Sequence, residues 1–263
     1  MIQLHHGDCL EVMKSIPDKS IDLVLTSPPY GEIKNYNGSL VWNFDIFKAI
    51  ANELFVKLSK GACIIWVVAD QTKKGTESGD SFKQVLYFKE IGLNIHDTMI
   101  FRKLNYQPLT HNRYEQEFEY IFCLSNGKPK TFNPIKVPCR YAGKKTFSSP
   151  NFYKSNNDSL ESVGGYTIKD TKIKGNIFEY RVGSLTETSN FKHPAMFPIS
   201  LVTDQLQSWS NEGDIIMDPF MGSGSTGVAC KNLNRSFIGI EKNDKYFNIA
   251  KERIENHVPS LLL

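Results

Sequence analysis

Two largely apolar runs constrain the fold of this chain more than any other feature. The runs are IDLVLT at residues 21–26 and GACIIWVVA at residues 61–69. A strand that is apolar at successive positions has both faces buried, and such strands are typical of parallel sheets covered by helices. Apolar residues at helical spacing over residues 44–58 lie between the two runs, which favours a strand-helix-strand unit. The sequence therefore predicts an α/β fold.

The rest of the chain continues this alternation. We expect further strands at residues 2–6, 95–102, 118–124, 214–218 and 236–241, and helices at residues 10–16, 81–91, 198–209, 222–233 and 244–257. The strands at 95–102 and 118–124 are close enough in sequence to form an antiparallel hairpin. Residues 71–80 are expected to be a polar loop, and residues 127–192 a loop-rich insertion. One domain interrupted by this insertion would consist of residues 1–126 and 193–263.

Composition excludes several classes of protein. With 263 residues, 40% of them hydrophobic, the chain can bury a large core. No stretch approaches the roughly 18 apolar residues of a membrane span, and residues 1–7 lack the pattern of a secretory signal. We therefore expect a cytoplasmic protein without a membrane partner. The five cysteines are scattered and form no Cys-x-x-Cys pair, so neither a disulfide framework nor a zinc site is expected.

Positive charge is concentrated in the insertion. Residues 127–192 contain 12 Lys and Arg against 5 Asp and Glu, a balance of +7, whereas the remainder has 19 against 23, or −4. Aromatic residues such as Tyr141 and Tyr153 lie between these cations. A basic surface with aromatics suits a nucleic acid, although a solvated loop could also have this composition. The candidate DNA-binding residues are Lys136, Arg140, Lys144, Lys145, Lys172 and Lys174.

A glycine-rich motif, DPFMGSGSTG at residues 218–227, follows one expected strand and opens the next helix. Its glycines match G-x-G-x-x-G, and Glu241 ends the following strand, where a carboxylate can accept hydrogen bonds from both hydroxyls of a ribose. Glycines allow a backbone to approach a ligand closely. Taken alone, this motif leaves a nicotinamide cofactor, S-adenosylmethionine and a tight packing turn as alternatives.

A second motif, TSPPY at residues 26–30, lies at the carboxyl end of the first apolar strand. Two prolines remove two backbone donors and fix the chain, so the carbonyls of Ser27 and Pro28 can accept from an amino group. The Ser27 hydroxyl is a further acceptor, and Tyr30 offers a flat ring for stacking. Such a cluster suits the exocyclic amine of a planar base, although Ser-Pro-Pro can also simply end a strand.

Together the motifs are more specific than either alone. The chain resembles the S-adenosylmethionine-dependent DNA amino-methyltransferases of the β arrangement, in which the catalytic motif precedes the target-recognition region and the cofactor loop comes last. The matching segments are GDCLE at residues 7–11, TSPPY at 26–30, HPAMFPISL at 193–201, DPFMGSGST at 218–226 and IGIE at 238–241. The resemblance implies a Rossmann-like methyltransferase sheet, mostly parallel with an antiparallel hairpin strand. Residues 127–192 lack a match and would be the target-recognition region.

The resemblance also implies the site residues. The catalytic set is Ser27, Pro28, Pro29 and Tyr30, and the cofactor-binding set is Asp8, Cys9, His193, Pro194, Phe197, Asp218, Pro219, Phe220, Gly222, Gly224, Thr226 and Glu241. The carbonyl and hydroxyl acceptors would localise the amine lone pair for direct methyl transfer, and the base would be flipped out of the duplex. All of this requires residues 26–30 and the turn after Asp218 to lie side by side.

The resemblance further implies double-stranded DNA as substrate, with any cognate restriction endonuclease a separate protein, and a monomer or a homodimer. In this family Ser at the first motif position is associated with N4-cytosine methylation, so Ser27 favours cytosine over N6-adenine. A protein-glutamine or RNA methyltransferase, a nicotinamide oxidoreductase and an inactive DNA-binding relative are the alternatives. Pro138 and Cys139 resemble the nucleophile of cytosine C5 methylases, but amine methylation needs no thiol, so we expect Cys139 to be incidental.

Overall fold

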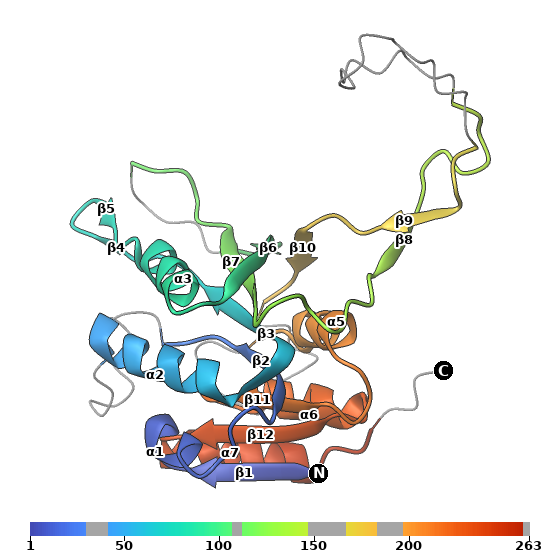
Figure 1. Ribbon diagram of the computed structural model, residues 1–263. Coiled ribbons are helices and arrows are strands. Elements are labelled where there is room, and N and C mark those ends of the chain that lie inside the picture. Colours follow the sequence, from blue (N-terminus) through green and yellow to red (C-terminus); the bar gives the residue numbers. More distant parts are fainter. Residues whose placement is uncertain (30–41, 107–111, 147–166, 183–196, 260–263) are drawn as a thin grey trace. The chain divides into compact units, whose positions relative to one another are not determined.

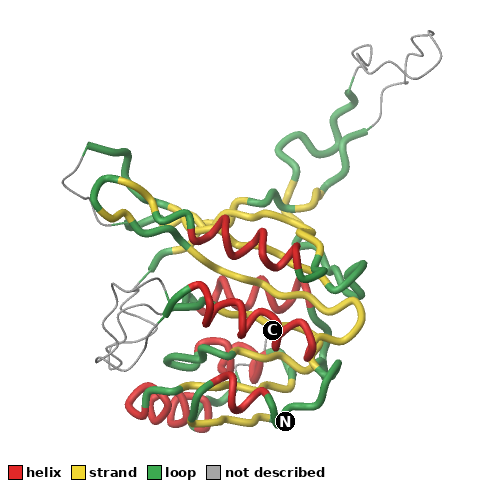
Figure 2. The backbone as a smooth tube through the Cα atoms, turned by 60° about the vertical axis from the view of Figure 1, so that its left-hand side comes forward, coloured by secondary structure: helices red, strands yellow, loops and turns green. Residues whose placement is uncertain are grey.

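The fold is built on one eight-stranded sheet with helices on both sides (Figures 1 and 2). A computed structural model describes residues 1–29, 42–106, 112–146, 167–182 and 197–259. In spatial order the strands are β1 (Ile2–His6), β12 (Ser236–Glu241), β11 (Ile215–Asp218), β2 (Ile21–Thr26), β3 (Leu58–Val68), β7 (Phe118–Ser125), β6 (Asn94–Lys103) and β10 (Ile177–Tyr180). The described helices are α1 (Cys9–Met13), α2 (Phe44–Lys57), α3 (Asp80–Glu90), α5 (Ile199–Trp209), α6 (Ser225–Asn232) and α7 (Asp244–Glu255).

Strand direction decides where functional residues can gather. Every neighbouring pair in this sheet is parallel except those that involve β7, which runs antiparallel to both β3 and β6. The predicted mostly parallel sheet with one antiparallel hairpin strand is therefore confirmed. The carboxyl ends of β1, β12, β11, β2 and β3 meet at one edge of the sheet, which is the edge where open α/β sheets bind ligands.

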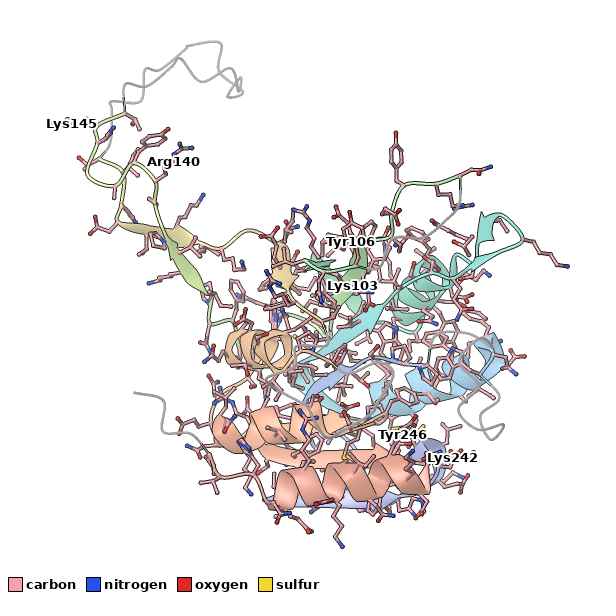
Figure 3. All side chains as sticks on the ribbon, turned by 180° about the vertical axis from the view of Figure 1, so that it is seen from behind. Lys103, Tyr106, Arg140, Lys145, Lys242 and Tyr246 are labelled. Carbon is pink, nitrogen blue, oxygen red and sulfur yellow. The ribbon has the colours of Figure 1, made fainter. Side chains whose placement is uncertain are left out.

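The helices form the two outer layers. Figures 1 and 3, drawn from opposite sides, show α1, α2 and α3 over one face and α5, α6 and α7 over the other. Local capping explains where several of these helices begin. The Asn43 side chain accepts from Ile46 N at the start of α2 (2.9 Å), and Asn243 does the same for Tyr246 N at the start of α7 (3.2 Å).

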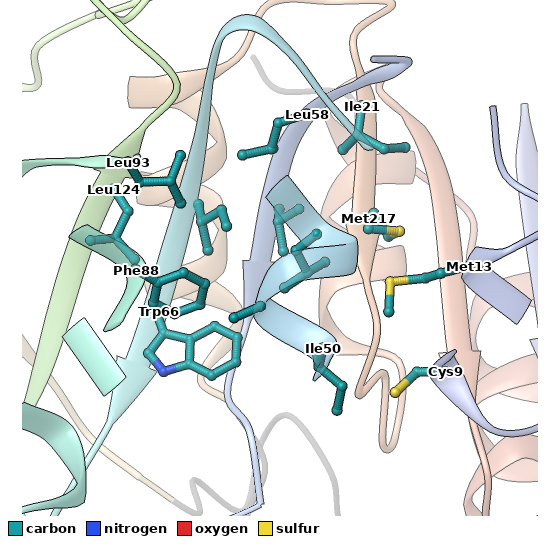
Figure 4. Packing of buried hydrophobic residues seen from close by; sticks show 14 of the residues in the cluster. Cys9, Met13, Ile21, Ile50, Leu58, Trp66, Phe88, Leu93, Leu124 and Met217 are labelled. Carbon is teal, nitrogen blue, oxygen red and sulfur yellow. The ribbon is translucent and has the colours of Figure 1, made fainter. Parts of the chain in front are cut away.

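Aromatic and aliphatic side chains fill the space between the sheet and the first helical layer (Figure 4). Trp66 of β3 is fully buried and meets Phe47 of α2 and Phe88 of α3 edge-on, with ring centroids 5.9 and 5.2 Å apart. Edge-on packing of aromatic rings adds to the stabilisation from area burial. Because helices cover the other side of the sheet as well, both faces of β2 and β3 are buried, which explains why residues 23–25 and 62–68 are apolar at successive positions.

Five short strands lie where the sequence indicates loops. Residues 71–80 include the small hairpin β4 (Thr72–Lys73) and β5 (Thr76–Glu77), and the region from 127 to 192 contains β8 (Lys136–Pro138), β9 (Thr171–Ile173) and β10. The expectation of loops was wrong at these places. Strands of two to four residues are too short for an alternating pattern to stand out. In β10 only Phe178 is buried, so a single apolar position marks this edge strand of the main sheet.

The chain divides into two compact units. The larger contains Met1–Asn133 and Asn176–Leu263, and the smaller is Pro134–Gly175. The smaller unit is narrower than residues 127–192 because its flanks, including β10, belong to the larger unit. Its described part is a ribbon of β8 and β9. Among the described residues, no helix combines the length and apolarity needed to span a membrane.

Candidate active site

The two motifs meet through neighbouring strands. Strands β2 and β11 pair directly, with Leu23 and Val24 opposite Ile216 and Met217. At their carboxyl ends, the Thr26 hydroxyl donates to the Asp218 carboxylate over 2.6 Å. The segment after Thr26 and the turn after Asp218 therefore start side by side, as the sequence argument required.

Asp218 is the centre of this junction. Its side chain is buried and accepts from the hydroxyls of Thr26 and Thr226, each at 2.6 Å, and from Phe220 N at 3.1 Å. Burial raises the pKa of Asp218 to about 6, against these hydrogen bonds, which lower it. These three contacts join the loop to β2 on one side and to α6 on the other. Asp218 therefore fixes the position of the glycine-rich loop.

Glu241 fixes the other side of the same loop. One of its carboxylate oxygens accepts from Gly222 N (2.9 Å) and the other from Asn243 N (2.8 Å). Burial raises the pKa of Glu241, and its backbone hydrogen bonds oppose this shift. The side chain is only partly buried. A carboxylate offers about four lone-pair sites, so Glu241 keeps acceptor capacity for hydroxyl groups.

The glycines of the motif allow α7 to pack closely. Gly224 has φ +82°, and a Cβ there would lie 2.9 Å from Ile254 Cδ1 of α7. At Gly227 a Cβ would overlap Ile254 and lie 2.8 Å from Phe237 Cε1. From the same helix, the Arg253 guanidinium donates to the carbonyl oxygen of Ser223 (3.1 Å). The loop is thus fixed by packing against α7 and β12 and by the hydrogen bond from Arg253.

Asp8 lies beside Glu241 because β1 and β12 pair in parallel, with His6 opposite Glu241. Asp8 caps α1 by accepting from Leu10 N (3.0 Å), and it forms an ion pair with Lys242 (3.1 Å), a residue labelled in Figure 3. Asp8 is therefore the N-cap residue of α1. The other predicted residue here, Cys9, is buried, and burial raises its pKa to about 12, which keeps the thiol neutral.

The remaining predicted residues differ in how far they are buried, and three of them are not described by the structure. Ser27 is partly exposed, whereas Pro28, Pro29 and Pro219 are buried. Phe220 is partly buried, and its ring meets Trp42 edge-on with centroids 5.5 Å apart. Phe197 is partly buried just before α5, and Gly222 has φ +54° within the loop. Tyr30, His193 and Pro194 lie outside the described residues.

The predicted DNA-binding residues all belong to the smaller unit. Lys136, Arg140, Lys144, Lys145 and Lys172 are exposed, and Lys174 is partly buried. Lys136 and Lys172 lie on the ribbon, three of the others lie in the segment that follows β8, and Lys174 directly follows β9.

Sequence reasoning missed three residues that shape the site. Thr26 was quoted within its motif but given no role. Arg253 of α7 and Lys242, which directly follows β12, had no signal at all, because their contacts with Ser223 and Asp8 join segments that are far apart in the sequence.

Comparison with known proteins identifies the family. A DNA methylase family model of the N6/N4 class matches residues 21–252. The chain is 42% identical over 250 residues to the orphan methyltransferase M.BamHII of Bacillus amyloliquefaciens, covering 93% of this chain and 92% of that protein. It is 27% identical to the type II methyltransferase M.BglII of Bacillus subtilis, covering 94% of this chain and 67% of that protein.

Solved structures agree with this assignment. The complex of M1.HpyAVI with SAM is 26% identical, with a TM-score of 0.62, and covers 96% of this chain and 100% of that one. The cytosine-N4-specific PvuII DNA methyltransferase, at 20% identity, shares the fold with a TM-score of 0.70 and covers 98% of this chain and 88% of that one. This chain is therefore a member of the N6/N4 DNA methylase family.

Proposed function

We propose that this DNA methyltransferase transfers a methyl group from S-adenosylmethionine to the exocyclic amine of a flipped base, with cytosine N4 as the target. The observation that carries the proposal is the hydrogen bond between Thr26 and Asp218. It joins the strand that leads to Ser27 and Pro28 to the strand that leads to the glycine loop. An amine held by the first segment and a methyl donor held by the second would then be neighbours.

The residues at the sheet edge suit this cofactor. Glu241 retains acceptor sites for the two ribose hydroxyls, and Asp8 offers a carboxylate to the adenine amine. The loop at residues 219–224 and the side chain of Phe197 would contact the remaining part of S-adenosylmethionine. S-adenosylmethionine supplies an electrophilic methyl group on a sulfonium. The relative M1.HpyAVI was solved with this molecule bound.

The role of residues 27–30 is to hold and orient the amine. The Ser27 hydroxyl and the Pro28 carbonyl would accept the two N–H groups, which favours a more tetrahedral nitrogen and localises its lone pair. Tyr30 would stack on the flipped base. Because direct transfer needs no covalent enzyme intermediate, orientation and hydrogen bonding account for the rate enhancement. Flipping costs a few kcal/mol.

The preference for cytosine rests on Ser27, through the family association of Ser at this position. A hydroxyl can accept from the amine of adenine as well as from that of cytosine, so adenine N6 is the alternative. Double-stranded DNA would bind through the cations of the smaller unit, which contact phosphates and not the reacting base. Any cognate restriction endonuclease would act as a separate protein, and the enzyme would work as a monomer or a homodimer.

The decisive experiment measures tritium transfer from labelled S-adenosylmethionine to duplex DNA, followed by nucleoside mass spectrometry. We expect label in DNA and N4-methylcytosine as the product. N6-methyladenine would overturn the choice of base and keep the enzyme class. Label in protein or RNA, or none at all, would overturn the function itself. Ser27→Ala should reduce transfer while leaving cofactor binding unchanged, whereas Glu241→Gln should weaken cofactor binding measured by calorimetry.

A further inference from the structure

The ribbon of the smaller unit is interrupted by a bulge at residues 140–142. Cys139 N donates to the carbonyl of Asp170 (2.8 Å), and Gly143 N donates to the carbonyl of Ile168 (2.9 Å). Three residues of one strand therefore stand opposite Lys169 alone. Inside the bulge, Ala142 N donates to the carbonyl of Cys139 (3.3 Å). Bulges of this kind redirect side chains away from the regular faces of a ribbon.

The side chain displayed by this bulge is Tyr141. It is 51% exposed, and among the described residues no other aromatic ring packs against it. Two cations lie over it instead: Arg140 Cζ is 5.6 Å and Lys144 Nζ 5.2 Å from the ring centroid. Such contacts are cation-π interactions, and they hold flexible cations near one aromatic ring. The bulge thus presents a flat ring flanked by two positive charges.

The charge around the ring is not balanced within the described part of this unit. That part contains seven Lys and Arg and a single acid, Asp170. Neither Arg140 nor Lys144 forms an ion pair with a described carboxylate. Figure 3 shows Arg140 and Lys145 on this same stretch of chain. Cations without carboxylate partners remain available to an anionic ligand.

The register of the ribbon places cations on both of its faces. Lys136 lies opposite Ile173, and Val137 lies opposite Lys172. Because side chains alternate between faces along a strand, Lys136 and Lys172 project from opposite faces. A flat anionic surface would engage only one face. The major groove of duplex DNA, which is about 12 Å wide and admits a two-stranded ribbon, has phosphates on both sides.

We propose that Tyr141 is a DNA-contacting residue whose ring packs against a nucleobase, while Arg140 and Lys144 hold phosphates beside it. The inference rests on the proposed DNA substrate, and it adds a residue that determines how tightly and where the ribbon docks. An acidic protein surface would satisfy the cations but would leave the exposed ring without a partner. A nucleic acid satisfies both.

The first test compares duplex binding by Tyr141→Ala, Tyr141→Phe and the wild type, using fluorescence anisotropy over a range of salt concentrations. Tyr141→Ala should bind roughly 5- to 150-fold more weakly, which is the range of about 1 to 3 kcal/mol for one contact between a base and an aromatic ring. The slope of log K against log salt should stay unchanged, because no charge is lost. Tyr141→Phe should bind like the wild type. Tyr114→Ala, at a fully exposed tyrosine of the larger unit, is the matched control and should have no effect.

A second measurement does not depend on whether Tyr141→Ala folds as stably as the wild type. The variant Tyr141→Trp introduces an exposed indole, whereas the native Trp42, Trp66 and Trp209 are buried. Acrylamide, a neutral quencher, should therefore report mainly on the new side chain. Duplex DNA should protect it from quenching if the ring packs against a base.

The outcomes separate this inference from the proposed function. If the wild type binds and methylates DNA but Tyr141→Ala binds equally well, the inference is wrong and the function stands. An equal loss of DNA affinity in Tyr141→Ala and Tyr141→Phe would assign the effect to the hydroxyl group and would refute packing of the ring against a base. Indole fluorescence of Tyr141→Trp that stays fully quenchable in the DNA complex would also refute it. A wild type that transfers no methyl group to DNA would instead overturn the proposed function.

Discussion

Replacing Asp218 by Asn should make the protein more stable at neutral pH without changing the shape of the site. Asn has the size of Asp and can keep all three contacts of the buried side chain. Its oxygen can accept from Thr26 and from Phe220 N, as the Asp218 Oδ1 atom does, and its amide nitrogen can donate to the Thr226 hydroxyl. The substitution therefore removes a buried charge and keeps all three contacts, with the direction of the hydrogen bond to Thr226 reversed.

The magnitude follows from the pKa. Burial raises the pKa of Asp218 from 3.8 to about 6. A group whose pKa is higher in the folded state contributes stability that is fully present below pH 3.8 and is lost as the pH rises through 6. At about 1.4 kcal/mol per pH unit, the loss in the wild type is roughly 3 kcal/mol, most of it above pH 4. The Asn variant has no such loss.

The assay is urea unfolding at several pH values between 4 and 7, followed by the fluorescence of the buried tryptophans. The free energy of unfolding of Asp218→Asn minus that of the wild type should rise by roughly 2 to 3 kcal/mol over this range. Taking the difference removes the contributions of other titrating groups. A difference that does not change with pH would refute the reasoning. Thr26→Val is the control, since it removes a hydrogen bond and should destabilise the protein at pH 7.

The same variant tests what Asp218 does in catalysis. Because the side chain is buried and its oxygens already accept from Thr26, Thr226 and Phe220 N, we expect Asp218→Asn to bind S-adenosylmethionine within a few-fold of the wild type. A large loss of cofactor affinity in a variant that is well folded would mean that the carboxylate charge acts on the cofactor directly, as first expected from the sequence.

Three further predictions concern packing, buried polarity and charge. Gly227→Ala should destabilise the protein by about 1 to 3 kcal/mol, because its methyl group would overlap Ile254 of α7, and thermal unfolding would measure this. Gln205→Leu should stabilise it by about 1 to 3 kcal/mol, because both amide atoms of this fully buried residue lack a hydrogen-bond partner among the described residues; a lower urea midpoint would contradict this. Replacing Lys144 and Lys145 by Gln should reduce the salt slope of DNA binding by about two, and an unchanged slope would remove them from the phosphate contacts.

Local pattern was sufficient for the long elements of the fold and insufficient for contacts made across it. The strands at 21–26 and 236–241 have the predicted bounds because most of their residues are buried, which makes the interior of each run largely apolar. Strand β10 was missed because one buried residue, Phe178, marks it. Nothing near residue 253 in the sequence could indicate that its guanidinium holds the loop at Ser223. Such contacts depend on where the folded layers bring distant segments together.

The glycine motif shows why local pattern left the cofactor undecided. In the structure, Gly224 and Gly227 face Ile254 of α7, so close helix packing by itself accounts for the absence of side chains there. Any fold that packs a helix on this loop would need the same glycines, whichever cofactor it binds. The informative feature is instead the Thr26 hydroxyl on Asp218, because it ties the glycine loop to the strand that carries Ser27. A nicotinamide enzyme with the same loop would leave Ser27, Pro28 and Pro29 without a role.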